Sequence, residues 1–308
     1  MQGLGTVLGF GEETTWGTTV APTKFIEITE ESLDLKQIVK ARTSLRSATP
    51  REPLKGKRGV EGSFKFNLCY EGAELLLKHL MGSVSTAVVG SLKQHSFLLA
   101  EALPTGLSLN LQRGEYSQDF RYGGCKVSKL TLTQNLEGFL EASIDIVGQE
   151  ETLVTHVTPT LPSAPFVMWD EFTGTFDSIA WPAQMIELTI ENPLANDSYK
   201  LGNRLRQRLE RGGVRKISGK VEMEFENISH YNYFRNQTQI GHTFTWTGPT
   251  VSGANYVLGV TGTKIVFQEA PMGVKSVGPI KIAMPFESFA SASNNETLIQ
   301  LTNTVVSV

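Results

Sequence analysis

The side chains that could carry out chemistry are few and poorly arranged for it. Cys69 and Cys125 are too few for a paired zinc site or a disulfide framework, so we interpret both as buried thiols. The five histidines show no metal-ligand spacing, and no pairing with histidine or aspartate suggests a cysteine nucleophile. The glycine-rich stretch 3–9 lacks the preceding strand and following helix of a dinucleotide loop. We therefore expect no cofactor, no metal ion and no enzymatic activity.

Basic side chains gather in two stretches of a chain whose formal net charge is −3. Residues 36–58 hold eight basic residues and one acid, and residues 200–216 hold seven basic residues and one acid. We expect both to be loops, and loops of this length are usually functional or are ordered only by a partner. Three interpretations remain open: phosphate binding, a solvated surface, and docking onto the acidic body of another copy.

The elements that must carry these stretches are strands with period-2 alternation. In residues 59–68, 139–147 and 216–226, apolar residues occupy one face and polar or charged residues the other. Such patterns are typical of antiparallel sheets with one buried and one wet face. Two segments, 71–82 and 227–237, have helical spacing, with Gly82 as a stop and Asn227 as an N-cap. The sequence predicts a mainly β fold with one short helix in each half.

The order of these elements repeats along the chain. A strand, a basic stretch, a second strand and a short helix occur in both halves, and Gly62 aligns with Gly219. We interpret this as a tandem duplication. The proline-containing stretch 156–166 interrupts it, because proline cannot donate to a sheet ladder. The expected domains are residues 1–155 and 167–308, joined by the linker 156–166.

The composition fits a folded, non-membrane chain. Its 308 residues are 40% hydrophobic and 19% charged, which argues against disorder. No apolar run approaches the roughly 20 residues of a membrane helix, and the N-terminus lacks the features of a secretory signal. We expect no membrane partner.

Three segments resemble bacteriophage tail tube proteins of long-tailed, siphovirus-like phages. They are GEETTWGTTVAPTKFIEITEESL (11–33), the strand and Leu-rich helix of residues 59–81, and YGGCKVSKLTLT (122–133) with its return strand ending in VGQEE. The resemblance covers about the first 150 residues. The second half matches through the internal repeat and lacks the GEETTWGTT and YGGC segments.

The resemblance implies two tandem β-sandwich or half-barrel domains, whose sheets join between subunits into one β-barrel around a lumen. The family normally forms six-fold rings, so a chain with two such domains would form a trimeric, pseudo-hexameric ring. A long loop of each domain would reach the neighbouring ring. The candidate inter-ring stacking residues are Lys36, Lys40, Arg42, Arg46, Arg51, Lys55, Lys57, Arg58, Lys200, Arg204, Arg206, Arg208, Arg211 and Arg215.

An acidic lumen would pass DNA without trapping it, because like charges repel over about 8 Å at physiological salt. Candidates for lumen or outer surface are Glu61, Glu141, Asp145, Glu222, Glu224 and Glu226. Reversing the charges of Arg204, Arg206 and Arg208 is expected to stop tube growth and leave the chain folded.

The leading prediction is therefore a structural virion protein, the major tail tube subunit, assembled in the host cytoplasm and located in the tail. Its expected partners are copies of itself, the tape measure protein, the tail tip and tail terminator proteins, and double-stranded DNA passing without specific binding. The alternatives are a contractile-tail inner tube or distal tail protein, or a DNA-binding protein that uses the basic stretches.

Overall fold

The fold is mainly β, with two short α-helices. The computed structural model describes residues 3–114, 117–273, 278–289 and 297–308. The first half contains β1 (Val7–Glu12), β2 (Lys24–Glu27), β3 (Glu30–Glu31), β4 (Asp34–Ser44), β5 (Ser47–Asn67), α1 (Glu74–Met81), β6 (Gly82–Val89), β7 (Leu92–Leu99), β8 (Leu107–Gln112), β9 (Gln118–Asn135), β10 (Glu141–Gly148) and β11 (Glu150–Thr155). The second half contains the 3₁₀ turn η1 (Trp169–Glu171), β12 (Phe172–Phe176), β13 (Ile179–Ala180), β14 (Ala183–Glu191), β15 (Lys216–Glu224), α2 (Ile228–Arg235), β16 (Ile240–Val251), β17 (Ala254–Phe267), β18 (Lys281–Ser288) and β19 (Thr297–Asn303). The predicted mainly β class with one short helix in each half is confirmed.

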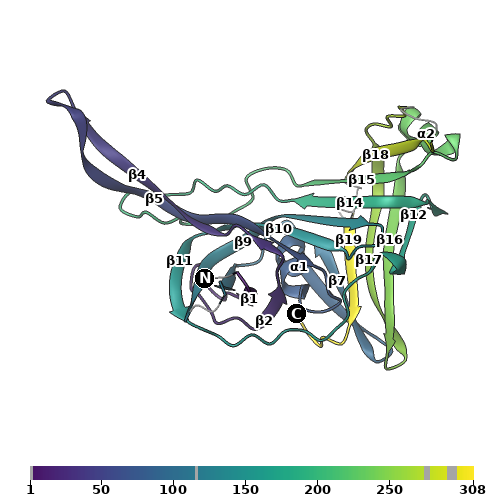
Figure 1. Cartoon of the computed structure of the whole chain (residues 1–308), viewed down its shortest axis with the longest axis horizontal. Helices are drawn as coiled ribbons and strands as arrows, with labels where there is room; N and C mark the ends of the chain where they lie inside the picture. Colours follow the sequence, from purple (N-terminus) through teal and green to yellow (C-terminus); the bar gives the residue numbers. More distant parts are fainter. Residues whose placement is uncertain (1–2, 115–116, 274–277, 290–296) are drawn as a thin grey trace.

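A central sheet crosses both halves of the chain. Its order is β4–β5–β10–β9–β14–β15–β18, and all neighbours are antiparallel. The two halves meet where Lys129–Asn135 of β9 pairs with Met185–Glu191 of β14. The sheets of the halves are thus already joined inside one chain (Figure 1).

Two further groups of strands flank the central sheet. The N-terminal part of β9 leaves it to pair with β8 and β11, and β1 and β2 continue that group. In the second half, β12, β16, β17 and β19 pair in that order, and the β6–β7 hairpin of the first half extends them. The strands form one connected antiparallel network, and it stays open instead of closing into a barrel within the chain.

The period-2 patterns place the core where the sequence predicted. Phe64, Ile144, Leu188 and Val221 are among the buried residues on the inner face of the central sheet. Gly62 and Gly219 occupy corresponding inner positions, and a Cβ atom at either would collide with neighbouring atoms. At Gly62 these atoms belong to the backbone of Ser32 and Leu33, so glycine permits a close approach of two strands there.

Both helices have the predicted caps. Gly82 ends α1 with φ 104°, a left-handed conformation that glycine adopts easily, and the Asn227 side chain accepts from the Ser229 amide at the start of α2. Of the residues at helical spacing in α2, Tyr231 and Phe234 are partly buried against the core, and Ile228 is not. Ile228 is 57% exposed, whereas His230 is buried against Trp181.

Candidate assembly surfaces

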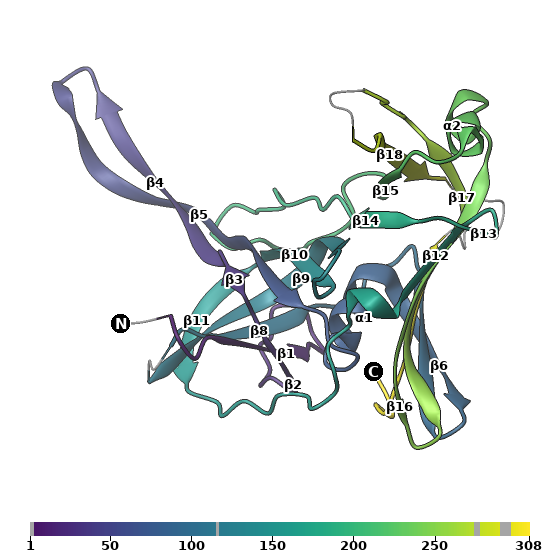
Figure 2. The same ribbon diagram turned by 45° about the vertical axis from the view of Figure 1, so that its right-hand side comes forward.

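The first basic stretch is a β-hairpin arm and not a structureless loop. We call residues 36–58 the arm; they belong to β4 and β5, which run out of the body as a two-stranded ribbon (Figures 1 and 2). Nearly all of its residues are exposed. Eight basic side chains lie on it: Lys36, Lys40, Arg42, Arg46, Arg51, Lys55, Lys57 and Arg58. The β4–β5 ladder has three register shifts between Gln37 and Ser44, and it pairs the backbone of this polar stretch without core contacts.

The arm also carries apolar side chains that contact no core. Ile38, Val39 and Leu54 are 51–64% exposed, and Leu45 at the tip is fully exposed. Exposed branched side chains close together on a protruding ribbon mark an interaction surface more often than a solvated one. Together with the charges, they make the arm suited to contact another protein surface.

The second basic stretch behaves differently. We call residues 192–215 the clasp, because they have almost no regular structure and lie across the root of the arm. The Arg58 amide donates to the Arg204 carbonyl (3.0 Å), and Arg204 Nε donates to the Gly56 carbonyl (2.8 Å). Lys57 forms an ion pair with Asp197 of the clasp. Most of the clasp therefore already has its partner in the same chain.

Arg206 is the anchor of the clasp. Its side chain is buried, and Nη1 donates to the carbonyls of Val60 (3.1 Å) and Gly148 (2.7 Å). Nη2 bonds to the Glu61 carboxylate. A Cβ atom on Gly59 would collide with this guanidinium, so glycine there gives it room. A charge held in this way stabilises the fold and is not exposed for contact with another subunit.

The predicted stacking residues thus fall into two groups. Lys36, Lys40, Arg42, Arg46, Arg51 and Lys55 project from the arm, and Lys200 and Arg208 are exposed on the clasp. Of these, Lys36, Arg42 and Arg208 form exposed ion pairs with nearby residues, whereas those of the second group bond to distant parts of the chain. Arg58 pairs with Glu150, Arg211 with Glu101, and Arg215 donates to Asn192 and to the Ala100 carbonyl. The expectation that Arg206 can be reversed without harm to the fold is wrong, since its guanidinium is buried.

Five of the six predicted acids share the wet face of the central sheet. The pairing of β5, β10, β9, β14 and β15 places Glu61, Glu141, Asp145, Glu222 and Glu224 on that face, and Glu226 follows the end of β15. The same face carries Glu187, Glu191 and Glu287, and the lysines Lys65, Lys129, Lys216, Lys220 and Lys281. Burial raises the pKa of Asp145. The face is mixed in charge with a surplus of acids.

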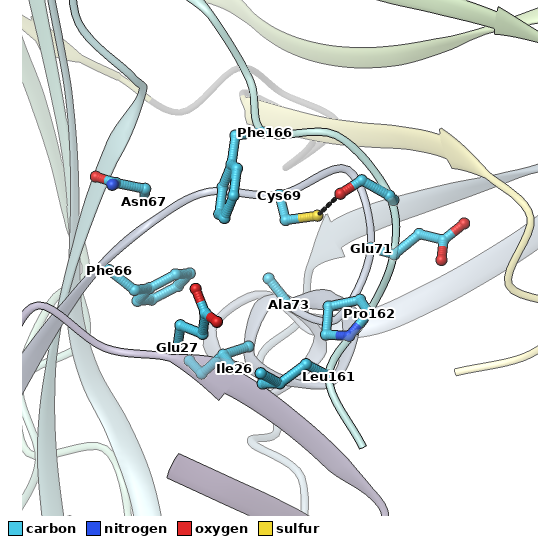
Figure 3. A pocket seen from close by; sticks show the side chains of 11 residues that line it. Ile26, Glu27, Phe66, Asn67, Cys69, Glu71, Ala73, Leu161, Pro162 and Phe166 are labelled. Atoms are coloured by element: carbon cyan, nitrogen blue, oxygen red, sulfur yellow. Dashed lines mark hydrogen bonds between the residues drawn. The ribbon is translucent and has the colours of Figure 1, made fainter. Parts of the chain in front are cut away.

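The two thiols are buried and free, as predicted. Burial raises the pKa of both, so they are protonated near neutral pH. Cys69 lies in an apolar hollow between β2 and the segment 161–166, where its Sγ donates to the Ala164 carbonyl (2.9 Å; Figure 3). Among the described residues, no three His, Cys, Asp or Glu side chains could hold a metal ion together.

The N-terminal segment and the YGGC segment form one structural unit. The buried Glu13 carboxylate accepts from the amides of Gly17 (2.7 Å) and Gly124 (2.8 Å), and Trp16 Nε1 donates to the Gly124 carbonyl (3.1 Å). Gly124 has φ 62°, and a Cβ atom on it would contact the Trp16 ring. The residue types of the two segments therefore depend on each other.

An open antiparallel sheet with a projecting basic ribbon is typical of a structural protein whose edges are available for pairing. The chain belongs to the phage tail tube protein family, whose sequence model matches residues 3–287, across both halves. It is therefore a structural component of the phage tail and not an enzyme, as the sequence predicted. The comparison with curated proteins gives no match. In the described part of the chain, no helix is both long and apolar enough to cross a membrane.

Proposed function

We propose that this chain is the major tail tube subunit and that it polymerises into stacked trimeric, pseudo-hexameric rings. The rings form the hollow conduit through which phage DNA is ejected. Each chain supplies two sibling domains, residues 1–155 and 167–308, joined by the linker 156–166. The observation that carries the proposal is the β9–β14 joint, at which two sheets of the same kind meet edge to edge.

Matching strand orders support the sibling domains. In the first half, β1, β8, β9, β10 and β5 are successive neighbours. In the second half, β12, β16, β17, β18 and β15 are neighbours in the same order. A helix follows β5 and β15 in each case. A duplicated domain produces this correspondence directly, since pairing order is set by the fold.

The β9–β14 joint also indicates which edge faces the next subunit. Met185 pairs with Glu222 and Ile190 with Ile217; correspondingly, Glu30 pairs with Lys65 and Leu35 with Val60. The stretch Glu30–Lys36 thus has the position of β14, but no strand pairs with its outer side in the described part of the chain. We propose that it is the edge offered to the next subunit.

The complementary edge is the stretch that continues β17. Val266 and Phe267 pair with β18, and the Gln268 amide donates to the Pro285 carbonyl (2.8 Å), which continues that ladder. Residues 268–273 therefore correspond to the part of β9 that pairs with β14. Joining them to Glu30–Lys36 of the next copy repeats the internal joint, and repetition with a closing rotation gives a ring.

The wet face of the central sheet is the proposed lumen surface. Its surplus of acids repels phosphate, so DNA passes without being held. Copies of the chain are the first partners in this assembly. The tape measure protein would lie inside the tube, and the tail tip and tail terminator proteins would bind its two ends.

Microscopy of the purified protein tests the proposal. Top views of assembled tubes should show three chains per ring and six lobes of two alternating kinds, because each chain supplies two unlike siblings. Six identical lobes, each holding a whole chain, would refute the trimer. A protein that remains monomeric at high concentration would refute polymerisation.

A further inference from the structure

The clasp is a basic segment of the second half that binds to the surface of the first half. The clasp continues directly from β14, crosses the β9–β14 joint, and reaches the edge of the other half. There it contacts the backbone of Gly56, Arg58 and Val60 on β5 and of Gly148 at the end of β10. We call this surface the first seat.

The second half has a surface in the corresponding place. Gly62 pairs with Ile146 and Gly219 pairs with Phe286, so residues of β5 and β15 correspond, as do residues of β10 and β18. By this correspondence Gly56, Val60 and Gly148 match Gly213, Ile217 and Ser288. These three residues line a hollow of about 570 Å³, together with Val214, Arg215 and Phe289. We call it the second seat.

The chain therefore contains two seats and two basic segments, and one of the segments, the clasp, occupies one of the seats. The clasp fills the first seat, whereas the arm contacts no second-half core and projects from the body (Figure 2). The arm continues from Glu30–Lys36 as the clasp continues from β14. If the edges join as proposed above, the arm crosses that joint onto the second half of the adjoining copy.

We propose that the arm of one subunit lies in the second seat of its neighbour within the same ring. This inference rests on the proposed edge-to-edge ring and adds the partner of the arm. The sequence-based expectation is that the arm contacts an adjacent ring. The clasp instead joins two halves that lie side by side in one sheet, and we expect the arm to make the corresponding contact.

The second seat differs from the first in the chemistry it offers. Lys216 stands in the position of Gly59, so a guanidinium could not approach as Arg206 does in the first seat. Val214 is 89% exposed and Phe289 is 40% exposed beside Ile217. The hollow is mixed in character, because Glu101, Arg211, Arg215 and Glu287 also line it. Its apolar side chains suit the exposed Ile38, Val39 and Leu54 of the arm, whose burial against them removes apolar surface from water.

A cysteine pair tests the contact. Asp197 lies six residues beyond Glu191, and Arg42 lies six residues beyond Lys36. Because Asp197 pairs with Lys57, which corresponds to Val214, we expect Arg42 of one copy to lie near Val214 of the next. The double variant Arg42→Cys, Val214→Cys should form disulfides between chains in oxidised tubes, while native Cys69 and Cys125 stay buried.

The size of the disulfide-linked products distinguishes a contact within one ring from a contact between stacked rings. A contact within a trimeric ring closes on itself, so the ladder on a denaturing gel should end at the trimer. Lys57→Cys with Asp197→Cys is the positive control and should link within one chain. Arg42→Cys with Leu201→Cys, at a fully exposed clasp position, should not link.

Tubes without linkage, a ladder that continues past the trimer, or equal linkage to Leu201→Cys would each overturn the inference and leave the proposed tube intact. A protein that forms no tubes in its natural sequence would overturn both.

Two substitutions of opposite charge at Val214 give a second test that does not depend on disulfides. Val214→Lys places a like charge against the basic arm, and Val214→Glu places an opposite charge there. The side chain is too exposed for either to disturb the fold. We expect the critical concentration for tube assembly to be about two- to fivefold higher for lysine than for glutamate, the range of one exposed charge pair. Equal values would contradict the inference.

Discussion

The arm and the clasp follow corresponding strands and are both basic, but the arm projects from the body whereas the clasp is bonded to it. The clasp follows β14 and is held by carbonyls and a carboxylate of the first half, with Arg206 as its anchor. The arm follows β3 and projects as an exposed ribbon. What distinguishes them is the neighbour: the clasp has the other half beside it in the same chain. We infer that a basic segment of this fold is completed by whichever half adjoins it.

Reversing charges on the arm should separate assembly from folding most sharply. We expect Arg42→Glu, Arg46→Glu, Arg51→Glu to abolish tubes while the unfolding temperature stays within about 2 °C, because these side chains contact no core. Electron microscopy and thermal unfolding measure the two effects. The matched control is Arg208→Glu on the clasp, which is also exposed and should leave tubes unchanged. Tubes of normal length from the triple variant would contradict the role of the arm.

Substitution of Arg206, the anchor of the clasp, should instead lower the stability of the folded subunit. Arg206→Met leaves the carbonyls of Val60 and Gly148 without their donor and Glu61 without its partner. We expect the free energy of unfolding to fall by about 2–4 kcal/mol. The same substitution at Arg51 should change it by less than about 0.5 kcal/mol. Urea unfolding of the soluble subunit measures both, and similar losses at the two positions would show that the arm and clasp are not distinct.

Local pattern was enough to predict the strands and caps. Alternation around Phe64 and Val221 identified the inner faces, and Gly82 and Asn227 end and begin helices as expected. Composition was not enough to separate the arm from the clasp, because both are rich in arginine and poor in apolar residues. The burial of Arg206 depends on carbonyls of strands distant in the sequence, such as Gly148, and no local signal marks them. A sequence clue existed in Gly59, which leaves room for the guanidinium.

Each half should lose stability in acid through one buried histidine. Burial lowers the pKa of His242 in the second half to about 4. Burial also lowers that of His79 in the first half to about 4, and Glu12 beside it (3.3 Å) acts in the opposite direction. Since the unfolded state takes up a proton near pH 6.5 and the folded state does not, stability is lost as the pH falls from 6.5 towards 4.

Substitution of His242 tests this. His242→Leu removes the proton uptake of the second half, so the loss of unfolding free energy between pH 6.5 and 4 should shrink by up to about 3 kcal/mol. Urea unfolding across that range is the measurement. The matched control is Thr243→Leu at the next, exposed position of β16, which removes no titratable group and should leave the pH profile unchanged. An unaltered profile for His242→Leu would contradict the assignment.

The smallest effect concerns the edge that the next subunit is proposed to join. In β14, Leu188 pairs with Leu132 of β9, whereas the corresponding Leu33 is capped by side chains. Its amide donates to Glu31 (3.0 Å), and its carbonyl accepts from Arg113 Nη2 (2.6 Å). Arg113 also pairs with Glu31 (3.0 Å), so one ion pair occupies both backbone groups that a neighbouring strand would use.

Removing the cap should therefore speed assembly while weakening the isolated subunit slightly. We expect Arg113→Met to shorten the lag of tube formation by about two- to fivefold and to lower the unfolding free energy by about 1 kcal/mol. Light scattering follows the lag. Arg121→Met is the matched control, because Arg121 bonds to Asn110 on the same group of strands. A lag that is unchanged or longer for Arg113→Met would mean that Leu33 is not where the next subunit pairs.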